Sequence, residues 1–245
     1  MTIPQNKLDE LLKRIKDAAG SGLISVILYG SAASGNYDPK LSNLNIFCVL
    51  RDSSFNIVKA FAPVAAWWVQ QKEPPFLLMT LEELRSSTDV FTIELMDMQR
   101  HYRVLHGEDV LQGLMIPMHF HRVHVEYELR EKLVLLRQRM LLASDNDKKL
   151  WDLLLHTVSS FATLFRHAAI ALGKDKDIDK RNALQSLASL LSSDLSAVEL
   201  VLDIRDHKAD SKKVDAYDLA RRYLAAVEQV TNAVDKKLES GAGNR

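Results

Sequence analysis

Apolar residues in the first fifty positions follow a helical period and then an extended one. Residues 6–19 carry apolar side chains three and four positions apart and stop at Gly20, which predicts an amphipathic helix. Residues 23–29 (LISVILY) form a short, β-branched, apolar run between glycines, which is typical of a buried strand. In residues 43–50 (NLNIFCVL) the odd-numbered positions share one face of a second strand. The pattern therefore predicts a helix followed by two strands.

The next stretch predicts one further helix that is interrupted. Ser53 or Ser54 can cap its N-terminus, and Pro63 falls near its middle. Because proline lacks an amide hydrogen and clashes with the preceding turn, we expect two helical pieces that end before Pro74. Residues 76–79 then form a third strand candidate.

Residues 80–106 predict a short helix and additional strands. Thr80 and Glu83 have the spacing of a capping box, which indicates the start of a helix. Residues 91–98 are predicted to form a strand, although their alternation is incomplete, and residues 103–106 supply another candidate. The first half of the chain is therefore predicted to be a mixed sheet with flanking helices.

After Pro117 the extended period disappears and the helical period continues to the end of the chain. Three long segments each keep one apolar stripe, and two shorter segments do the same over fewer turns. The long segments are residues 129–140, 151–172 and 216–234, and the short ones are residues 184–191 and 195–204. This pattern predicts a helical bundle with three long and two short members.

The change of period predicts the domain organisation. We expect an α/β domain in residues 1–117, a helical bundle in residues 118–239 and a disordered tail in residues 240–245. The predicted fold class is α+β, with an N-terminal mixed sheet followed by a C-terminal helical bundle.

Charge and cysteine content narrow the classes of function. Lys plus Arg and Asp plus Glu each total 32 in 245 residues, so the net charge is zero. This balance argues against a long nucleic acid or a membrane surface as the partner. Cys48 is the only cysteine, which excludes an intrachain disulfide and a cysteine-based zinc site. With no membrane-spanning run in the sequence, we expect a cytoplasmic protein.

One stretch carries candidate chemistry. Residues 25–35 (SVILYGSAASG) place a Gly-Ser turn and a second glycine directly after the first predicted strand. Residues 42–46 (SNLNI) begin the second strand. Together they resemble the signature of the nucleotidyltransferase superfamily, which includes DNA polymerase β and the aminoglycoside nucleotidyltransferases. Members of that superfamily carry Gly-Ser after a strand and Ser-Asp-x-Asp on the next strand.

The match to that signature is complete except at the two aspartates. The resemblance implies that Gly30, Ser31 and Ser42 contact the phosphates of a nucleoside triphosphate (NTP), since a Gly-Ser turn lets backbone amides and a hydroxyl approach them closely. The two positions that bind Mg²⁺ in the superfamily are Asn43 and Asn45 here. Asparagine has no charge, and a cation repels its amide nitrogen. The resemblance therefore implies a degenerate metal site with weakened Mg²⁺ binding.

A third carboxylate in the same sheet is the remaining candidate for catalysis. Active members of the superfamily place one on a later strand, and Glu94 and Asp97 lie in the predicted strand 91–98. On an ideal strand these two side chains point to opposite faces, so at most one of them is expected to join the site. Glu94 is preferred because its neighbours are both apolar. It could hold a single Mg²⁺ together with the nucleotide's phosphates.

Three functional hypotheses follow. The first is a catalytically impaired or inactive nucleotidyltransferase-fold protein that binds a nucleotide or a protein partner. The second is an active enzyme that transfers a nucleoside monophosphate from an NTP to a hydroxyl of a small molecule or protein. The third is an interaction module whose long helices bind a partner or a second copy of the chain. The impaired nucleotidyltransferase is preferred because both metal-binding charges are missing.

Overall fold

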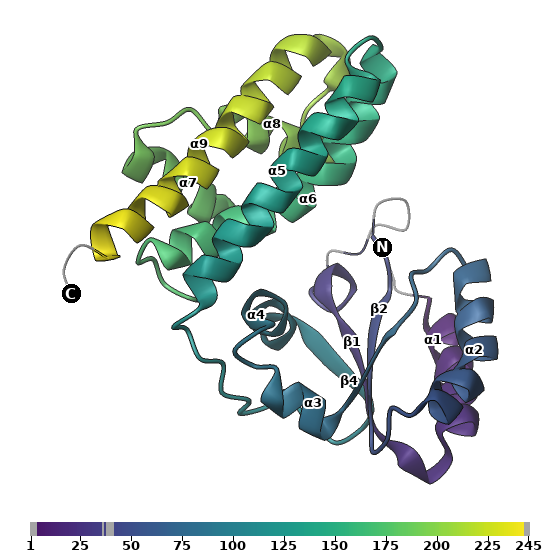
Figure 1. Ribbon diagram of the computed structural model, residues 1–245. Coiled ribbons are helices and arrows are strands. Elements are labelled where there is room, and N and C mark those ends of the chain that lie inside the picture. Colours follow the sequence, from purple (N-terminus) through teal and green to yellow (C-terminus); the bar gives the residue numbers. More distant parts are fainter. Residues whose placement is uncertain (1–3, 36, 38–41, 243–245) are drawn as a thin grey trace. The chain divides into compact units, whose positions relative to one another are not determined.

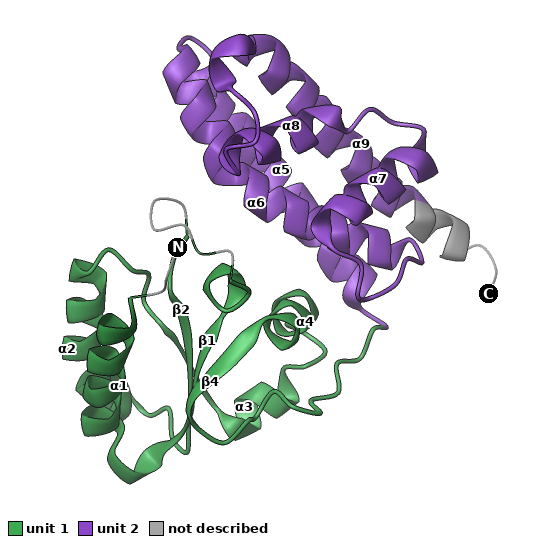
Figure 2. Ribbon diagram, turned by 180° about the vertical axis from the view of Figure 1, so that it is seen from behind, with its two compact units in different colours: residues 1–118 green, residues 119–245 purple. Residues whose placement is uncertain are grey.

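The computed structural model describes residues 4–35, 37 and 42–242 (Figure 1). It divides into two compact units, Met1–Met118 and His119–Arg245 (Figure 2). Unit 1 contains a mixed sheet with flanking helices, and unit 2 is helical, so the predicted fold class is confirmed.

Unit 1 is organised around a four-stranded sheet of order β3-β2-β1-β4. The strands are β1 (Leu23–Tyr29), β2 (Asn45–Leu50), β3 (Leu77–Thr80) and β4 (Tyr102–Gly107). β1 is antiparallel to both β2 and β4, whereas β3 is parallel to β2. The last residue of β1, Tyr29, pairs with Asn45 on one side and Tyr102 on the other. The end of β1 and the starts of β2 and β4 therefore meet at one edge of the sheet.

Different helices cover the two faces of this sheet (Figure 1). α1 (Gln5–Ala19), which leads into the short turn η1 (Gly20–Gly22), packs with α2 (Phe55–Gln70) on one face. α3 (Leu81–Ser86) and α4 (Thr92–Arg100) pack on the other. In β2, Ile46, Cys48 and Leu50 face the first pair of helices, and Phe47 and Val49 face the second. The predicted period of two is thus confirmed within β2.

The predicted break at Pro63 is wrong, because α2 runs unbroken from Phe55 to Gln70 with the proline inside it. Proline in a helix leaves the carbonyl four residues earlier without its partner. That carbonyl belongs to Lys59, and both Lys59 and Pro63 are exposed. Water can therefore replace the lost hydrogen bond, while Phe61, Val64 and Trp68 keep the apolar face of the helix buried.

The predicted strand at 91–98 is also wrong, because these residues belong to α4 and the preceding turn. Thr92, Ile93, Leu95 and Met98 are the buried positions, at a helical and not an alternating spacing. Leu95 and Met98 pack against the sheet face formed by Phe47 and Val49. Tertiary packing of one helical face therefore overrides the local preference for a strand. The capping box of Thr80 and Glu83, by contrast, is present at the start of α3.

The described part of unit 2 contains three long and two short α-helices, as predicted. They are α5 (His121–Ala143), α6 (Asp147–Ala171), α7 (Lys180–Leu191), α8 (Ser196–Arg205) and α9 (Ala216–Ala242), with a short turn η3 (Ser211–Lys213) before α9. α6 packs against each of the other four helices. Of the tail predicted to be disordered, residues 240–242 lie in α9, and residues 243–245 lie outside the described residues. No helix in the described ranges is both long and apolar enough to span a membrane.

A buried chain of hydrogen bonds joins α5 to α6. His121 Nε2 lies 2.9 Å from His167 Nδ1, and a guanidinium nitrogen of Arg166 lies 2.9 Å from His167 Nε2. A guanidinium can only donate, so His167 Nε2 accepts and its Nδ1–H donates to His121. His121 is 1% exposed. Burial, followed by the neighbouring His167 and the positive charge of Arg166, lowers the pKa of His121 to about 3.

This lowered pKa predicts acid lability of the bundle. The unfolded chain binds a proton at His121 below about pH 6.5, whereas the folded chain binds it only near pH 3. The free energy of unfolding should therefore fall as pH drops through this window, by up to about 1.4 kcal/mol per pH unit. Urea denaturation between pH 7 and pH 4 measures this slope. His121→Asn should reduce the slope, whereas the same substitution at the exposed His156 should leave it unchanged. Equal slopes in the wild-type protein and both variants would contradict His121 as the source of the acid lability.

Candidate functional site

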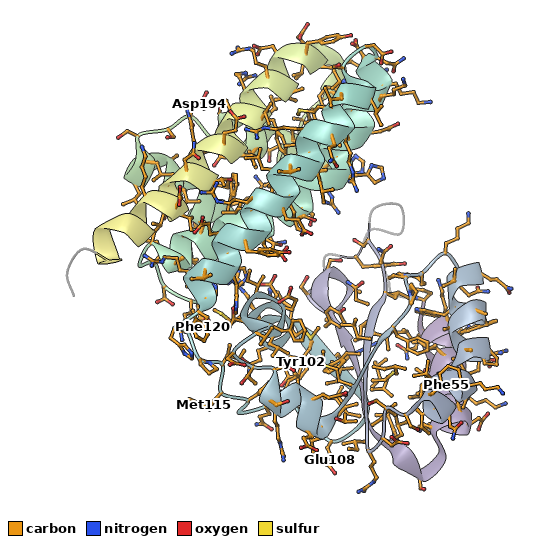
Figure 3. The ribbon with its side chains drawn as sticks, in the orientation of Figure 1. Phe55, Tyr102, Glu108, Met115, Phe120 and Asp194 are labelled. Carbon is orange, nitrogen blue, oxygen red and sulfur yellow. The ribbon has the colours of Figure 1, made fainter. Side chains whose placement is uncertain are left out.

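The turn after β1 is tied to the start of β4. Gly30 N–H donates to the carbonyl of His101, at 3.0 Å, directly before Tyr102 begins β4. Gly30 has a φ of +80°, a conformation that side chains disfavour. Figure 3 labels Tyr102 at this end of β4 and Glu108 just beyond its other end. The glycine of the signature therefore lies at the edge of the sheet where three strands meet.

The turn itself is a single 3₁₀ turn, η2 (Gly30–Ala32). The amides of Ala33 and Ser34 both donate to the carbonyl of Gly30, at 3.0 and 3.1 Å. The hydroxyl of Ser34 donates to the carbonyl of Ser31, at 3.0 Å. These bonds fix the backbone of the turn and hold Ser31, which is half-buried, next to Gly30.

Asn45 packs directly against Gly30. A Cβ placed on Gly30 would lie 3.1 Å from Asn45 Nδ2, so the amide would have to shift by a few tenths of an ångström to admit a side chain at position 30. Asn45 is half-buried and is the first residue of β2. The sequence-predicted phosphate turn and one of the two degenerate metal positions are thus in contact.

Asn43 and Ser42 precede the strand. β2 begins at Asn45, two residues later than the alternating pattern predicted, so Asn43 is not held by strand pairing. Asn43 is exposed, whereas Ser42 is half-buried. Between the two asparagines, the backbone amide of Leu44 donates to Glu73 Oε2 at 2.7 Å. Glu73 was not predicted from the sequence, and nothing in its local pattern distinguishes it from a surface glutamate.

Glu94 and Asp97 lie on α4 and not on a strand. Three residues apart on a helix, they share one face, so the expectation that only one of them can join the site loses its basis. Glu94 is exposed and Asp97 is half-buried. The pKa of Tyr29 is raised, first by burial and then by the negative charge of Glu94. Because Tyr29 directly precedes Gly30, the carboxylate of Glu94 acts electrostatically at this edge of the sheet.

The residues at this edge do not fit the two-metal site of the superfamily. Mg²⁺ relies on the charge of one or two carboxylates, and the two signature positions here are neutral amides whose nitrogens are donors. Across residues 4–35, 37 and 42–242, no group of three or more His, Cys, Asp or Glu side chains could hold a metal ion. We therefore derive no step through a metal at this edge.

A separate open cavity of about 660 Å³ lies at the other end of the sheet. It is lined by Ile24 from the start of β1, by Leu50 and Thr80 from the ends of β2 and β3, and by residues of α3. None of the sequence-predicted site residues lines it. The sequence signature and this cavity are thus different features of unit 1.

Comparison with solved structures identifies the fold. No family model matches the sequence, and no curated protein matches it significantly. Among the solved structures that match is spectinomycin adenyltransferase AAD(9) from Enterococcus faecialis, in a crystal structure with ATP and spectinomycin. The TM-score is 0.56 at 16% sequence identity, over 94% of this chain and 99% of that chain. The resemblance seen in residues 25–46 is thereby supported at the level of fold: the chain has the nucleotidyltransferase fold.

Proposed function

We propose that the protein binds a nucleotide at the edge formed by Gly30, Ser31 and Asn45, and that its capacity for nucleotidyl transfer is impaired. The observation that carries the proposal is the contact between Gly30 and the amide of Asn45. A neutral hydrogen-bond donor stands beside the phosphate turn, at a position where the superfamily has a carboxylate. The solved neighbour was crystallised with ATP, which supports a nucleotide as the ligand.

The same substitution has opposite effects on binding and on catalysis. A triphosphate is strongly negative, so a carboxylate beside it repels it unless a cation lies between them. An amide and the hydroxyl of Ser31 can both donate to phosphate oxygens without any cation. Transfer of the nucleotidyl group, however, requires cations on the phosphate oxygens and an in-line acceptor. The site is therefore suited to holding a nucleotide and poorly suited to transferring one.

A charge at the turn tests where the nucleotide binds. Ser31→Asp places a carboxylate beside the phosphates and should weaken ATP binding by about 10-fold or more, since one unfavourable charge contact of about 1.4 kcal/mol has that effect. Ser86→Asp adds the same charge at the end of α3, beside the cavity at the other end of the sheet from the turn, and should leave the affinity unchanged. Isothermal titration calorimetry in EDTA measures both. Equal affinities for the two variants would contradict the proposed site.

An active transferase is the second candidate, because Glu94 and Asp97 share a face of α4 and Glu94 acts electrostatically on Tyr29. In this case Glu94 is the residue on which catalysis depends, and the acceptor is a hydroxyl of a small molecule or of a protein; the solved neighbour was crystallised with the small molecule spectinomycin. Labelled NTPs incubated with a panel of aminoglycoside-like acceptors test it. Product that Glu94→Gln abolishes would establish the active enzyme and overturn the impaired one.

A further inference from the structure

An ion pair between a half-buried lysine and a buried glutamate lies next to the segment that carries both asparagines. Lys7 Nζ lies 2.5 Å from Glu73 Oε1 and also donates to the carbonyl of Gln71 at 3.0 Å. The ammonium group of Lys7 lies 5.1 Å from the centre of the Trp68 ring. Glu73 is 7% exposed and Trp68 is fully buried. The pair thus joins the N-terminal helix α1 to the chain that follows α2.

Glu73 uses its second oxygen on the backbone of Leu44. Glu73 Oε2 accepts from Leu44 N–H at 2.7 Å, while the side chain of Leu44 is fully buried in the core beneath α1 and α2. Strand pairing begins only at Asn45, so this backbone amide lies outside the hydrogen-bonded ladder. Leu44 is therefore held through its side chain and through its amide, and Asn43 and Asn45 are its two neighbours in the chain.

The chain that presents Glu73 is itself held in an unusual conformation. Lys72 has a φ of +64°, which non-glycine residues rarely adopt. Gln71 N–H donates to the carbonyls of Trp67 and Trp68, and Pro74 and Pro75 follow Glu73 directly. Proline fixes its own φ and also restricts the residue before it to extended conformations. The backbone is thus constrained on both flanks of Glu73, and its carboxylate contacts Lys7 and Leu44.

A partly buried ion pair adds little stability, because desolvation of the glutamate and screening of the half-buried lysine offset most of their attraction. What such a pair can supply is one defined geometry. We propose that Glu73, locked by Lys7, is a positioning residue: it fixes Leu44 and thereby the orientation of the Asn43 and Asn45 amides toward a bound nucleotide. The predicted effect on nucleotide binding rests on the proposed function. The predicted effect of Glu73 on the positions of Leu44 and Asn45 is independent of it.

The chemistry of the contacts gives a rescue test. Both carboxylate oxygens of Glu73 accept from donors, one from Lys7 and one from Leu44. In Glu73→Gln only one terminal atom can accept, and the other is an amide that donates, so one donor faces another donor. The double variant Lys7→Met/Glu73→Gln removes the ammonium, so the glutamine oxygen can turn to Leu44. Glu73→Gln should lose the hydrogen bond from the Leu44 amide, and the double variant should restore it.

Amide hydrogen exchange of Leu44 in the nucleotide-free protein is the first readout. Glu73→Gln should speed it by about 10-fold or more, which corresponds to loss of one charge-assisted hydrogen bond, and the double variant should return it toward the wild-type rate. ATP affinity, the second readout, should follow the same order. Ser25→Ala is the matched control, because it removes a buried hydroxyl that donates to the Glu108 carbonyl at 2.7 Å, at the other end of β1.

Each outcome decides the proposal. The proposal is overturned if Glu73→Gln leaves the exchange rate of the Leu44 amide unchanged. It is also overturned if Glu73→Gln speeds this exchange without changing the ATP affinity. A loss of ATP affinity in Glu73→Gln no larger than the loss in Ser25→Ala overturns it as well. If the wild-type protein binds no ATP, the proposed function fails, and the side-chain amide signals of Asn45 in the nucleotide-free protein decide the positioning role instead. They should shift or broaden in Glu73→Gln and return in the double variant; identical spectra overturn the proposal.

Discussion

Gly107→Ala should cause the largest loss of stability of any single substitution considered for this chain. Gly107 ends β4, has a φ of +82° and pairs with Ser25 of β1. A Cβ at this position would lie 2.0 Å from the carbonyl oxygen of Ile24 and 2.9 Å from its carbonyl carbon. Both are backbone atoms of β1, so no rotation of a side chain can relieve the clash. The end of β4 must separate from the sheet, which also strains the bond from Glu108 N–H to Ile24 at 3.1 Å.

We expect the free energy of unfolding to fall by about 4 kcal/mol or more, within the range of the most damaging backbone substitutions. Gly113→Ala is the matched control, since Gly113 also has a positive φ, of +71°, but nothing lies within 4 Å of its added Cβ. It carries only the conformational penalty, about 1 to 2 kcal/mol. Urea denaturation compares the two variants. Equal losses would show that the close approach of Gly107 to Ile24 does not limit stability.

The second large effect is expected at Asn43 and Asn45, the two positions that the sequence signature predicts to be degenerate metal positions. Asn43→Asp/Asn45→Asp places one carboxylate beside Gly30 and a second one two residues earlier in the chain. In EDTA, two repulsive contacts of about 1.4 kcal/mol each should weaken ATP binding by about 100-fold. Mg²⁺ should return much of the lost affinity, because it can bind between carboxylates and phosphates. The double variant should therefore bind ATP in a magnesium-dependent way, as measured by calorimetry with and without Mg²⁺.

The matched control makes the same chemical change at another place. Gln138→Glu/Gln185→Glu also converts two exposed amides to carboxylates, but in α5 and α7 of unit 2. Its ATP affinity should equal that of the wild-type protein in both buffers. If the control and the site variant lose affinity equally in EDTA, the effect comes from net charge alone, and the asparagines do not face the phosphates.

The elements predicted correctly from the sequence are those whose local pattern and tertiary role agree. β1 is apolar except at Ser25 and is covered on both faces, and successive side chains of β2 enter two different cores in turn. The long helices of unit 2 each bury apolar residues at helical spacing, although α6 is buried on all sides over residues 164–170 and α5 also exposes Leu141 and Leu142. α4 was predicted incorrectly, because its short apolar segment is compatible with a strand until the face on which Leu95 and Met98 pack is known.

In the candidate site, too, the features with a local sequence pattern were predicted and the contacts between distant residues were not. The signature around Gly30 predicted a phosphate turn and a neighbouring Asx position, and the structure brings Gly30 and Asn45 into contact, although their role stays a prediction. The relation between Glu94 and Asp97 was misjudged because it depended on the type of secondary structure. Glu73 lies 29 residues from Leu44 in sequence, and no periodicity or motif connects the two. Contacts of this kind arise only from the way α1, α2 and the sheet pack together.

Thermal melting of the wild-type protein with ATP, in EDTA and in Mg²⁺, tests the central claim most directly. A ligand that binds only the folded chain raises the melting temperature, by an amount equivalent to about 2.7 kcal/mol at 100 times its dissociation constant. Because neutral donors flank the Gly30–Ser31 turn, we predict a rise of similar size in both buffers. A rise that requires Mg²⁺ would mean that Glu94 or Asp97 completes a metal site and would contradict the metal-independent account. No rise in either buffer would contradict nucleotide binding itself.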